Sequence, residues 1–228
     1  MSKYPNLTHQ VVLVTGAAGG LGSALTLKLS QHGSVVVALD KNPKVLNEMA
    51  DHVLAETGTE PVIYPMNLLG ATPDDFSRLA EAIAEKLNRL DAIVHTATAF
   101  SGLTPFEHYE PTRWLKEIQV NLNSPAFLTQ ALLPLLKENA GRILFTGEDR
   151  RLPHKPYWGA YGVAKAGIMA FSHMLAEELE NSGVTVETIT PPPMHTRHRA
   201  KAWPAEDPVS LANPLDVAET YLQALNRR

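Results

Sequence analysis

The amino-acid sequence predicts a three-layer α/β fold, in which helices cover both faces of a doubly wound parallel sheet. Three observations predict it. Short, β-branched apolar segments alternate with longer segments of helical periodicity. The apolar segments are continuous, which is typical of strands that are buried on both faces. A glycine-rich turn also follows the first apolar segment and leads directly into a helical one.

Six strands and five helices are expected in alternation, joined by right-handed crossovers. The strands are predicted at 10–14, 35–39, 62–64, 92–94, 142–145 and 184–189, and the helices at 21–32, 44–57, 73–88, 112–139 and 160–181. Thr72 precedes Pro73 and two acidic residues, which is typical of a helix start. Gly33, Gly141 and Gly183 stand just before strands, where we expect left-handed helix caps.

Length and composition indicate one folded domain over residues 1–228, with no repeat and no linker. The chain has 228 residues, of which 44% are hydrophobic and 19% charged, so a disordered chain is excluded. A net charge of −4 does not favour nucleic acid as a partner. The absence of cysteine excludes disulfides, thiol catalysis and cysteine-ligated zinc. Because the sequence shows neither a signal peptide nor a membrane-spanning stretch, we expect a cytoplasmic protein without membrane contact.

The turn after the first strand has the pattern of a phosphate-binding loop. Its glycines allow a tight turn, a close approach of the backbone to a diphosphate, and close packing of helix on strand. The N–H groups at the start of the following helix then face the anion. The sequence therefore predicts the dinucleotide-binding turn of a Rossmann fold, with cofactor contacts from Gly16, Ala18, Gly20, Leu21 and Gly22.

Asp40 ends the second predicted strand, eighteen residues after Gly22. A carboxylate at this place accepts both hydroxyls of an adenosine ribose and repels a 2′-phosphate, so it favours NAD. The adjacent Lys41 leaves NADP open as the cofactor. The alternative is that Asp40 is a turn residue before Asn42 and Pro43.

Tyr161 and Lys165 lie four residues apart in a predicted helix, and therefore on one face of it. A phenol with a pKa near 10 is a poor proton shuttle at neutral pH. A nearby ammonium favours the phenolate, so we expect Lys165 to lower the pKa of Tyr161 toward the range that general acid–base catalysis needs.

With these two motifs the sequence resembles the short-chain dehydrogenase/reductase family over almost its whole length. Thr15-Gly16-x-x-x-Gly20-x-Gly22 is similar to the family's cofactor loop, and Tyr161-x-x-x-Lys165 to its catalytic signature. The stretches around Trp158 and 203–208 further resemble a bacterial subgroup. The resemblance implies hydride transfer between NAD(P) and a carbonyl or secondary alcohol substrate, with Tyr161 as the general acid or base. It also implies a homodimer or homotetramer, formed through the two long helices predicted at 112–139 and 160–181.

The resemblance assigns further residues to the site. Lys165 would also hold the nicotinamide ribose, Asn121 the proton-relay water, and Asn67 with Leu68 the adenine. Thr196 would meet the cofactor amide or phosphate. Thr96, Ala97 and Pro191 stand in segments that contact the cofactor in the family, although both segments depart from the family pattern: the first is His95-Thr96-Ala97-Thr98, and the second is Pro191-Pro192-Pro193. No seventh strand, usual in the family, can be recognised.

The most consequential departure from the family pattern is Glu148. The family has its catalytic serine thirteen residues before the tyrosine, and that position holds Glu148 in this sequence. A serine hydroxyl donates to the substrate carbonyl, whereas an ionised carboxylate has no proton to donate and opposes the Tyr161 phenolate. Thr146 has a hydroxyl, but we expect it to point elsewhere.

Two functions therefore remain open. The first is an NAD(P)-dependent oxidoreductase that uses Tyr161, Lys165, Asn121 and the group at Glu148. The second is a catalytically impaired dinucleotide-binding protein with a role in sensing or assembly. We expect no metal site, because His195-x-x-His198 is surrounded by basic residues. The proline-rich segment 191–214 is either a lid that attracts an anionic substrate or a solvated loop, and residues 98–110, 148–158 and 192–212 are expected to shape the small-molecule pocket.

Overall fold

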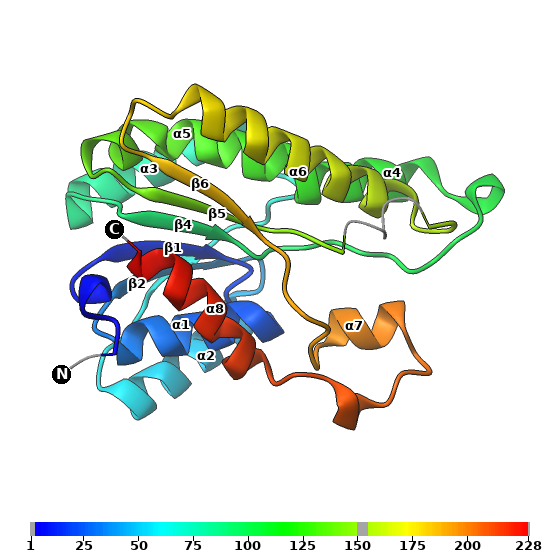
Figure 1. Cartoon of the computed structure of the whole chain (residues 1–228), viewed down its shortest axis with the longest axis horizontal. Helices are drawn as coiled ribbons and strands as arrows, with labels where there is room; N and C mark the ends of the chain where they lie inside the picture. The colour runs from blue at the N-terminus through cyan, green and yellow to red at the C-terminus, as the bar shows by residue number, and fades with distance from the viewer. Residues whose placement is uncertain (1–2, 150–154, 228) are drawn as a thin grey trace.

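The computed structural model describes residues 3–149 and 155–227 and contains one parallel sheet. Its six strands lie in the order β3-β2-β1-β4-β5-β6 (Figure 1). They are β1 (Val11–Thr15), β2 (Val35–Asp40), β3 (Val62–Pro65), β4 (Ala92–His95), β5 (Arg142–Thr146) and β6 (Thr185–Ile189). The predicted doubly wound α/β fold is therefore confirmed, with each expected strand present.

Helices cover both faces of this sheet (Figure 1). On one face lie α1 (Gly20–Gln31), α2 (Pro43–Thr57) and α8 (Pro214–Asn226). On the other lie α3 (Pro73–Leu87), α4 (Pro111–Ile118), α5 (Ser124–Glu138) and α6 (Gly159–Glu178). Alternate residues of β1 enter the two cores: Val12 packs with the α1 and α8 side, and Leu13 with the α3 and α5 side. This double burial explains why the strands are continuously apolar.

The segment predicted as one helix over 112–139 consists of three parts. A π-helical stretch, Gln119–Asn123, separates α4 from α5. Such π-turns occur frequently at functional sites, because the extra residue redirects the side chains near it. The stretch contains Asn121, so the irregularity falls on a residue that the sequence analysis assigns to the site.

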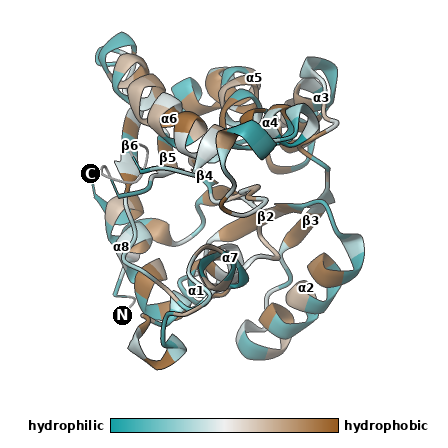
Figure 2. Ribbon diagram, turned by 90° about the vertical axis from the view of Figure 1, so that its right-hand side faces the viewer, coloured by the Kyte–Doolittle hydropathy of each residue, from teal (hydrophilic) through white to brown (hydrophobic). Residues whose placement is uncertain are grey.

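Two helices lie inside or just after the proline-rich segment, where no helix was predicted. The short helix α7 (Arg197–Ala202) is capped by Thr196, whose Oγ1 accepts the N–H of Arg199 at 3.1 Å. The helix α8 is capped by Asn213 and has Pro214 in its first turn. Figures 1 and 2 show α7 beyond the carboxyl ends of the strands, on the side of α1.

Of the three left-handed glycine caps that the sequence predicts, the one at Gly141 is wrong. Gly33 and Gly183 have φ values of 83° and 79°, as left-handed caps do, but before β5 it is Ala140 that takes the left-handed conformation, with φ of 48°. Gly141 is needed for space instead, since a Cβ there would lie 2.7 Å from Leu136 Cδ2.

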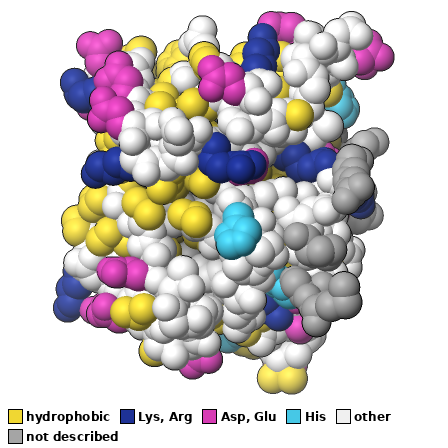
Figure 3. All heavy atoms as spheres, turned by 90° about the vertical axis from the view of Figure 1, so that its left-hand side faces the viewer, with side chains coloured by type: hydrophobic (Ala, Val, Ile, Leu, Met, Phe, Trp, Pro, Cys, Tyr) yellow, Lys and Arg dark blue, Asp and Glu magenta, His cyan; other side chains and the backbone are white. Residues whose placement is uncertain are grey.

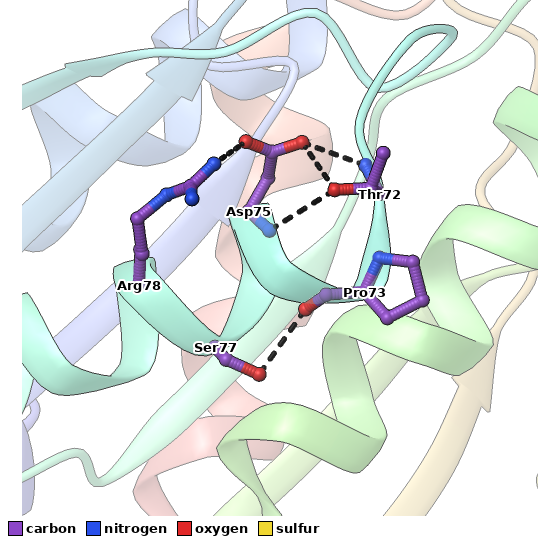
Figure 4. Close-up of polar contacts among 5 residues, drawn as sticks. All are labelled: Thr72, Pro73, Asp75, Ser77 and Arg78. Atoms are coloured by element: carbon purple, nitrogen blue, oxygen red, sulfur yellow. Dashed lines mark hydrogen bonds and ion pairs between the residues drawn. The ribbon is translucent and has the colours of Figure 1, made fainter.

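The start of α3 agrees with the sequence. Thr72 Oγ1 accepts the N–H of Asp75, and the Asp75 carboxylate accepts the N–H of Thr72 at 2.8 Å (Figure 4). Each side chain thus satisfies a backbone N–H group of the other residue, which is a capping box.

The end of the molecule where the strands begin carries acidic and basic side chains interspersed with apolar ones (Figure 3). The candidate site lies at the opposite end, beyond the carboxyl ends of the strands. In the described part of the chain, no helix has the length and apolar character needed to cross a membrane.

Candidate active site

Three glycines in and after the turn between β1 and α1 have no room for a side chain. Gly16 has a φ of 67°, and a Cβ at this position would lie 2.7 Å from Ala97 Cα. A Cβ at Gly20 would lie 2.7 Å from Thr196 Cγ2, and one at Gly22 would lie 2.1 Å from the carbonyl oxygen of Gly16. The loop therefore packs against the segments that follow β4 and precede α7, and a Cβ at any of these three glycines would require a neighbour to move.

The amino end of α1 has no side-chain cap. Gly19 is the N-cap residue and offers no side-chain oxygen to the first-turn N–H groups. The N–H groups of Gly20 and Leu21 cannot be reached by a carbonyl of the same helix. With the positive end of the helix dipole, they form a site suited to a phosphate group. This local arrangement fits the diphosphate of a dinucleotide.

A cleft of about 1600 Å³ opens beside this loop, at the carboxyl ends of the strands. It lies where the strand order reverses, between β1 and β4, which is the usual ligand position in such sheets. The cleft brings together almost all predicted site residues: Gly16, Ala18, Gly20, Leu21, Gly22, Asp40, Asn67, Leu68, Thr96, Ala97, Glu148, Tyr161, Lys165, Pro191 and Thr196. Asn121 is the exception, since it is buried behind the cleft wall.

Asp40 joins the end of β2 to the glycine loop. Its Oδ2 accepts the N–H of Ala18 at 3.2 Å, and its Oδ1 accepts the N–H of Asn42 at 3.3 Å. The residue therefore has a turn role and also faces the cleft, where Lys41 lies beside it. The two roles that the sequence left as alternatives are compatible.

The segment after β4 is held against β1. Thr96 Oγ1 donates to the carbonyl oxygen of Thr15 at 2.6 Å, and the N–H of Ala97 donates to Thr15 Oγ1 at 3.2 Å. On the other side of the cleft, Asn67 Oδ1 accepts the N–H of Leu69 at 3.2 Å. These bonds fix the cleft walls through backbone contacts.

Tyr161 lies in the first turn of α6 with its ring almost completely buried. Its hydroxyl donates to Glu148 Oε2 at 2.8 Å, and His198 Nε2 lies 3.3 Å from the same oxygen. Burial, and then the negative charge of Glu148, raise the pKa of Tyr161 well above its usual value of 10. The expectation that the pKa of Tyr161 is lowered toward the neutral range is therefore wrong, since the net shift is upward.

Lys165 lies one turn further along α6. Its Nζ donates to the carbonyl oxygen of Thr146 at 2.8 Å and stands 5.7 Å from the centre of the Tyr161 ring. Burial lowers the pKa of Lys165 to about 8, which leaves it mainly charged at neutral pH. The Thr146 hydroxyl accepts a hydrogen bond from Tyr221 of α8 at 3.0 Å, so it points away from Tyr161 as expected.

Asn121 fastens the segment after β4 to the helical layer. Its Nδ2 donates to the carbonyl oxygens of Ala99 and Glu117 at 2.7 and 2.8 Å. Its Oδ1 accepts the Thr98 hydroxyl at 3.0 Å and the N–H of Ala99 at 2.9 Å. The side chain thus holds Thr98 in the cleft wall, while the water-holding role that the resemblance implies stays a prediction.

Aromatic rings cover Tyr161 on the side of α7, and sequence reasoning missed this cluster. The Phe100 ring lies 5.2 Å from the ring of Tyr161 and 5.3 Å from those of Trp158 and His198. Trp203 packs on Trp158 at 5.0 Å. The one signal in the sequence is the pair His195-x-x-His198, whose spacing suggests a metal site rather than a contact with Tyr161. No cluster of three metal-ligating side chains occurs within 3–149 and 155–227.

The segments expected to shape the substrate pocket contribute Thr98, Ala99 and Phe100, then Glu148 and Asp149, and then the residues before and within α7. Residues 150–154, which the prediction also included, lie outside the described residues.

This fold and this cleft agree with the comparisons with known proteins. The short chain dehydrogenase family model matches residues 10–207. YciK, an uncharacterized oxidoreductase of Escherichia coli K12, is 35% identical over 221 residues, which cover 96% of this chain and 87% of YciK. The chain therefore belongs to the short chain dehydrogenase family, and the resemblance found in the sequence is confirmed.

Two solved structures extend the comparison. A short chain dehydrogenase from Shigella flexneri 2a, complexed with NADP, has a TM-score of 0.92 and 33% identity, with 98% of this chain and 93% of that chain covered. One from Escherichia coli CFT073, complexed with NADPH, has a TM-score of 0.93 and 34% identity, with the same shares covered, 98% and 93%. Relatives named as oxidoreductases do not favour the alternative of a catalytically impaired binding protein.

Proposed function

We propose that this chain is an NADP(H)-dependent oxidoreductase that interconverts a carbonyl compound and a secondary alcohol, with Tyr161 as the general acid or base. The observation that carries the proposal is that the uncapped amino end of α1, Tyr161 and Lys165 line one cleft. Family membership and the named oxidoreductase relatives support the same activity.

The residues of the cleft fit a nicotinamide dinucleotide. The N–H groups of the glycine loop would hold its diphosphate, Asn67 and Leu68 would border the adenine, and Lys165 would hold the nicotinamide ribose. A bound cofactor would supply or accept the hydride. The chain contributes position and proton transfer, because no amino-acid side chain is a hydride donor.

The choice between NADP and NAD concerns Asp40 and Lys41. Asp40 alone favours NAD, but the two solved relatives hold NADP and NADPH. The two Asp40 oxygens accept the N–H groups of Ala18 and Asn42, and these contacts offset part of the carboxylate charge. We infer that NADP(H) is the preferred cofactor, with the Lys41 ammonium beside its 2′-phosphate.

In the direction of reduction, Tyr161 gives its proton to the substrate oxygen. The high pKa of Tyr161 keeps the phenol protonated at neutral pH, which suits an acid and hinders formation of a phenolate. The Lys165 ammonium favours the phenolate that remains after transfer, while the Glu148 carboxylate opposes it. The balance between these two charges sets how readily Tyr161 exchanges its proton.

The test compares wild type with Tyr161→Phe. Calorimetry with NADPH measures cofactor binding, and loss of NADPH absorbance with a panel of ketones and β-keto esters measures turnover. The variant should keep its NADPH affinity within about twofold and lose turnover by at least about 100-fold, as expected for removal of a general acid. Unchanged turnover in the variant would refute the role of Tyr161, and a wild type that does not bind NADPH would refute the cofactor.

We further propose a homodimer or homotetramer in the cytoplasm, formed through the α4, α5 and α6 layer. Its support is that apolar side chains stand exposed on these helices: Leu115, Phe127, Val163 and Met174. Light scattering coupled to gel filtration tests this proposal, and a monomer at all micromolar concentrations would contradict it.

A further inference from the structure

His198 of α7 is the only described side chain whose N–H group lies within hydrogen-bonding distance of the Tyr161 hydroxyl. The Tyr161 oxygen has Glu148 Oε2 at 2.8 Å and His198 Nε2 at 3.3 Å. The Thr98 hydroxyl also contacts the phenol, and this hydrogen bond lowers the pKa of Tyr161, while the same hydroxyl donates to Asn121 Oδ1 at 3.0 Å. Since the tyrosine proton goes to Glu148, the histidine contact requires Nε2 to be the donor.

The His198 ring is neutral and held in place. Burial lowers its pKa to about 4, and the charges of Lys165, Arg199 and Lys201 act in the same direction, so at neutral pH it carries a single N–H. The ring packs against Phe100 and Tyr161, with centres 5.3 Å apart in both cases. A neutral imidazole with Nε2–H is thus presented to the reacting oxygen of Tyr161.

Further contacts hold α7 over the cleft. Arg199 Nε and Nη2 donate to the Glu206 carboxylate, at 2.5 and 2.6 Å, and the guanidinium lies 3.5 Å from the centre of the Trp203 ring. Lys201 Nζ donates to the carbonyl oxygen of Phe100 at 3.1 Å. The Lys201 bond connects α7 to the segment after β4, and the Arg199 contacts connect it to the residues that follow the helix, so the position of His198 is determined from two sides.

Carbonyl reduction needs a second donor to the substrate oxygen besides Tyr161, because negative charge develops on that oxygen. The Glu148 carboxylate accepts a hydrogen bond here, the Thr146 hydroxyl points to Tyr221, and Lys165 Nζ donates to a carbonyl oxygen. We propose that His198 is a catalytic residue whose Nε2–H supplies this second hydrogen bond.

The inference rests on the proposed function and adds one residue to it. In the reduction, bound NADPH would supply a hydride to the carbonyl carbon, and the C=O π electrons would move to the oxygen. The substrate oxygen takes the proton of Tyr161, and the Tyr161 phenolate then regains a proton from water. His198 keeps its proton throughout. It donates first to the phenol oxygen in the protein without substrate, and then to the substrate oxygen that binds beside the phenol.

The first test is independent of any substrate. Nitrogen NMR of labelled wild-type protein at neutral pH, with the His198 signals assigned by their loss in His198→Gln, reports which ring nitrogen is protonated. The expected result is a neutral ring protonated at Nε2. A ring protonated at Nδ1, or a charged ring at neutral pH, would overturn the proposal.

The second test separates chemistry from packing. His198→Phe keeps a ring between Phe100 and Tyr161 but has no N–H, whereas His198→Gln has an amide N–H. With NADPH and acetoacetyl-CoA as the probe, we expect kcat to fall about 100- to 1000-fold in His198→Phe, as for loss of one oxyanion donor, and to recover in part in His198→Gln. NADPH affinity, measured by calorimetry, should stay within about twofold in both.

The control is His173→Phe, at an exposed position of α6, which should match wild type. An unchanged kcat in His198→Phe, or equal losses in both His198 variants, would overturn the catalytic role. If wild type binds NADPH but reduces neither acetoacetyl-CoA nor the ketone panel, the proposed function fails, and the NMR result alone then decides whether His198 is the donor to Tyr161.

Discussion

The hydroxyl of Tyr161 donates a hydrogen bond of 2.8 Å to Oε2 of Glu148, which precedes it by thirteen residues. The same carboxylate that accepts the phenol proton also disfavours the phenolate through its charge. The pair therefore keeps the proton on Tyr161. For the phenol to act as an acid, a substrate oxygen must replace Glu148 as the acceptor of this proton.

Glu148→Gln should lower the pKa of Tyr161, since it removes the charge but retains a side chain of similar size. Burial, the larger cause of the raised pKa, is unchanged in this variant, so we expect only part of the shift to be lost. The measurement is the ultraviolet tyrosinate absorbance of the variant against pH, with Tyr161→Phe in the same background to isolate the signal. An unchanged or higher pKa in Glu148→Gln would show that the carboxylate charge has no influence on the phenol.

The stability of the fold should respond to the same pair at alkaline pH. Because the pKa of Tyr161 is raised in the folded state, this residue contributes stability that is present below pH 10 and is lost as the pH rises above it. Urea unfolding between pH 8 and 11 should therefore show a steeper loss of stability in wild type than in Tyr161→Phe. Parallel curves for the two proteins would contradict the raised pKa.

Cofactor selectivity should depend on the two residues at the end of β2. Lys41→Ala should weaken NADPH binding about fivefold, the equivalent of about 1 kcal/mol for an exposed ion pair, and leave NADH binding unchanged. Asp40→Ala should improve NADPH relative to NADH, because a carboxylate opposes the 2′-phosphate. Calorimetric titration of both cofactors measures both effects, and tighter binding of NADH than of NADPH by wild type would contradict the proposed preference.

Gly20 and Thr196 should be coupled, although they lie in distant parts of the sequence. The Cβ of Gly20→Ala would meet Thr196 Cγ2 at 2.7 Å, so this variant should displace the start of α7 and weaken NADPH binding. Adding Thr196→Ser removes that methyl group and keeps the hydroxyl that caps Arg199, so the double variant should recover most of the affinity. The single variant Thr196→Ser is the control, and no recovery in the double variant would contradict a steric cause.

The sequence was sufficient to predict the sheet and most of the cleft, because both depend on local patterns. Continuous apolar segments mark the strands, and the glycine loop with Asp40 marks the site at their carboxyl ends. The helix α7 was not predicted, since its six residues include three basic ones and give no apolar periodicity. The π-helical turn at Gln119–Asn123 was not predicted either, because it leaves no signal in the sequence, although the family resemblance did assign Asn121 to the site.

Contacts between residues that are distant in the chain could not be predicted from the sequence either. Phe100, Tyr161 and His198 meet only because the segment after β4, the helix α6 and the helix α7 end at one side of the sheet. The raised pKa of Tyr161 has the same origin, because it depends on burial under these rings. A spacing of four residues placed Lys165 near Tyr161 correctly, but it could not show that burial and Glu148 outweigh the ammonium.

The capping box of α3 supplies a stability test away from the cleft. Thr72→Ala removes the hydroxyl that accepts the N–H of Asp75, and we expect a loss of about 1 kcal/mol in the free energy of unfolding. Thr72→Ser retains the hydroxyl and should stay close to wild type. Urea unfolding followed by circular dichroism measures both, and equal stability of Thr72→Ala and Thr72→Ser would show that the cap contributes nothing.

Asp75, the partner of Thr72 in this capping box, should make the stability of the cap depend on pH. Hydrogen bonds from the Thr72 backbone and hydroxyl, together with Arg78, lower the pKa of Asp75 to about 2 (Figure 4). A carboxyl whose pKa is lower in the folded state contributes stability that is present above its unfolded pKa of 3.8 and is lost as the pH falls toward 2. Asp75→Asn should therefore be less stable than wild type at pH 6, and the difference should shrink between pH 4 and pH 2. A difference that stays constant over this range would mean that Asp75 acts only through its shape.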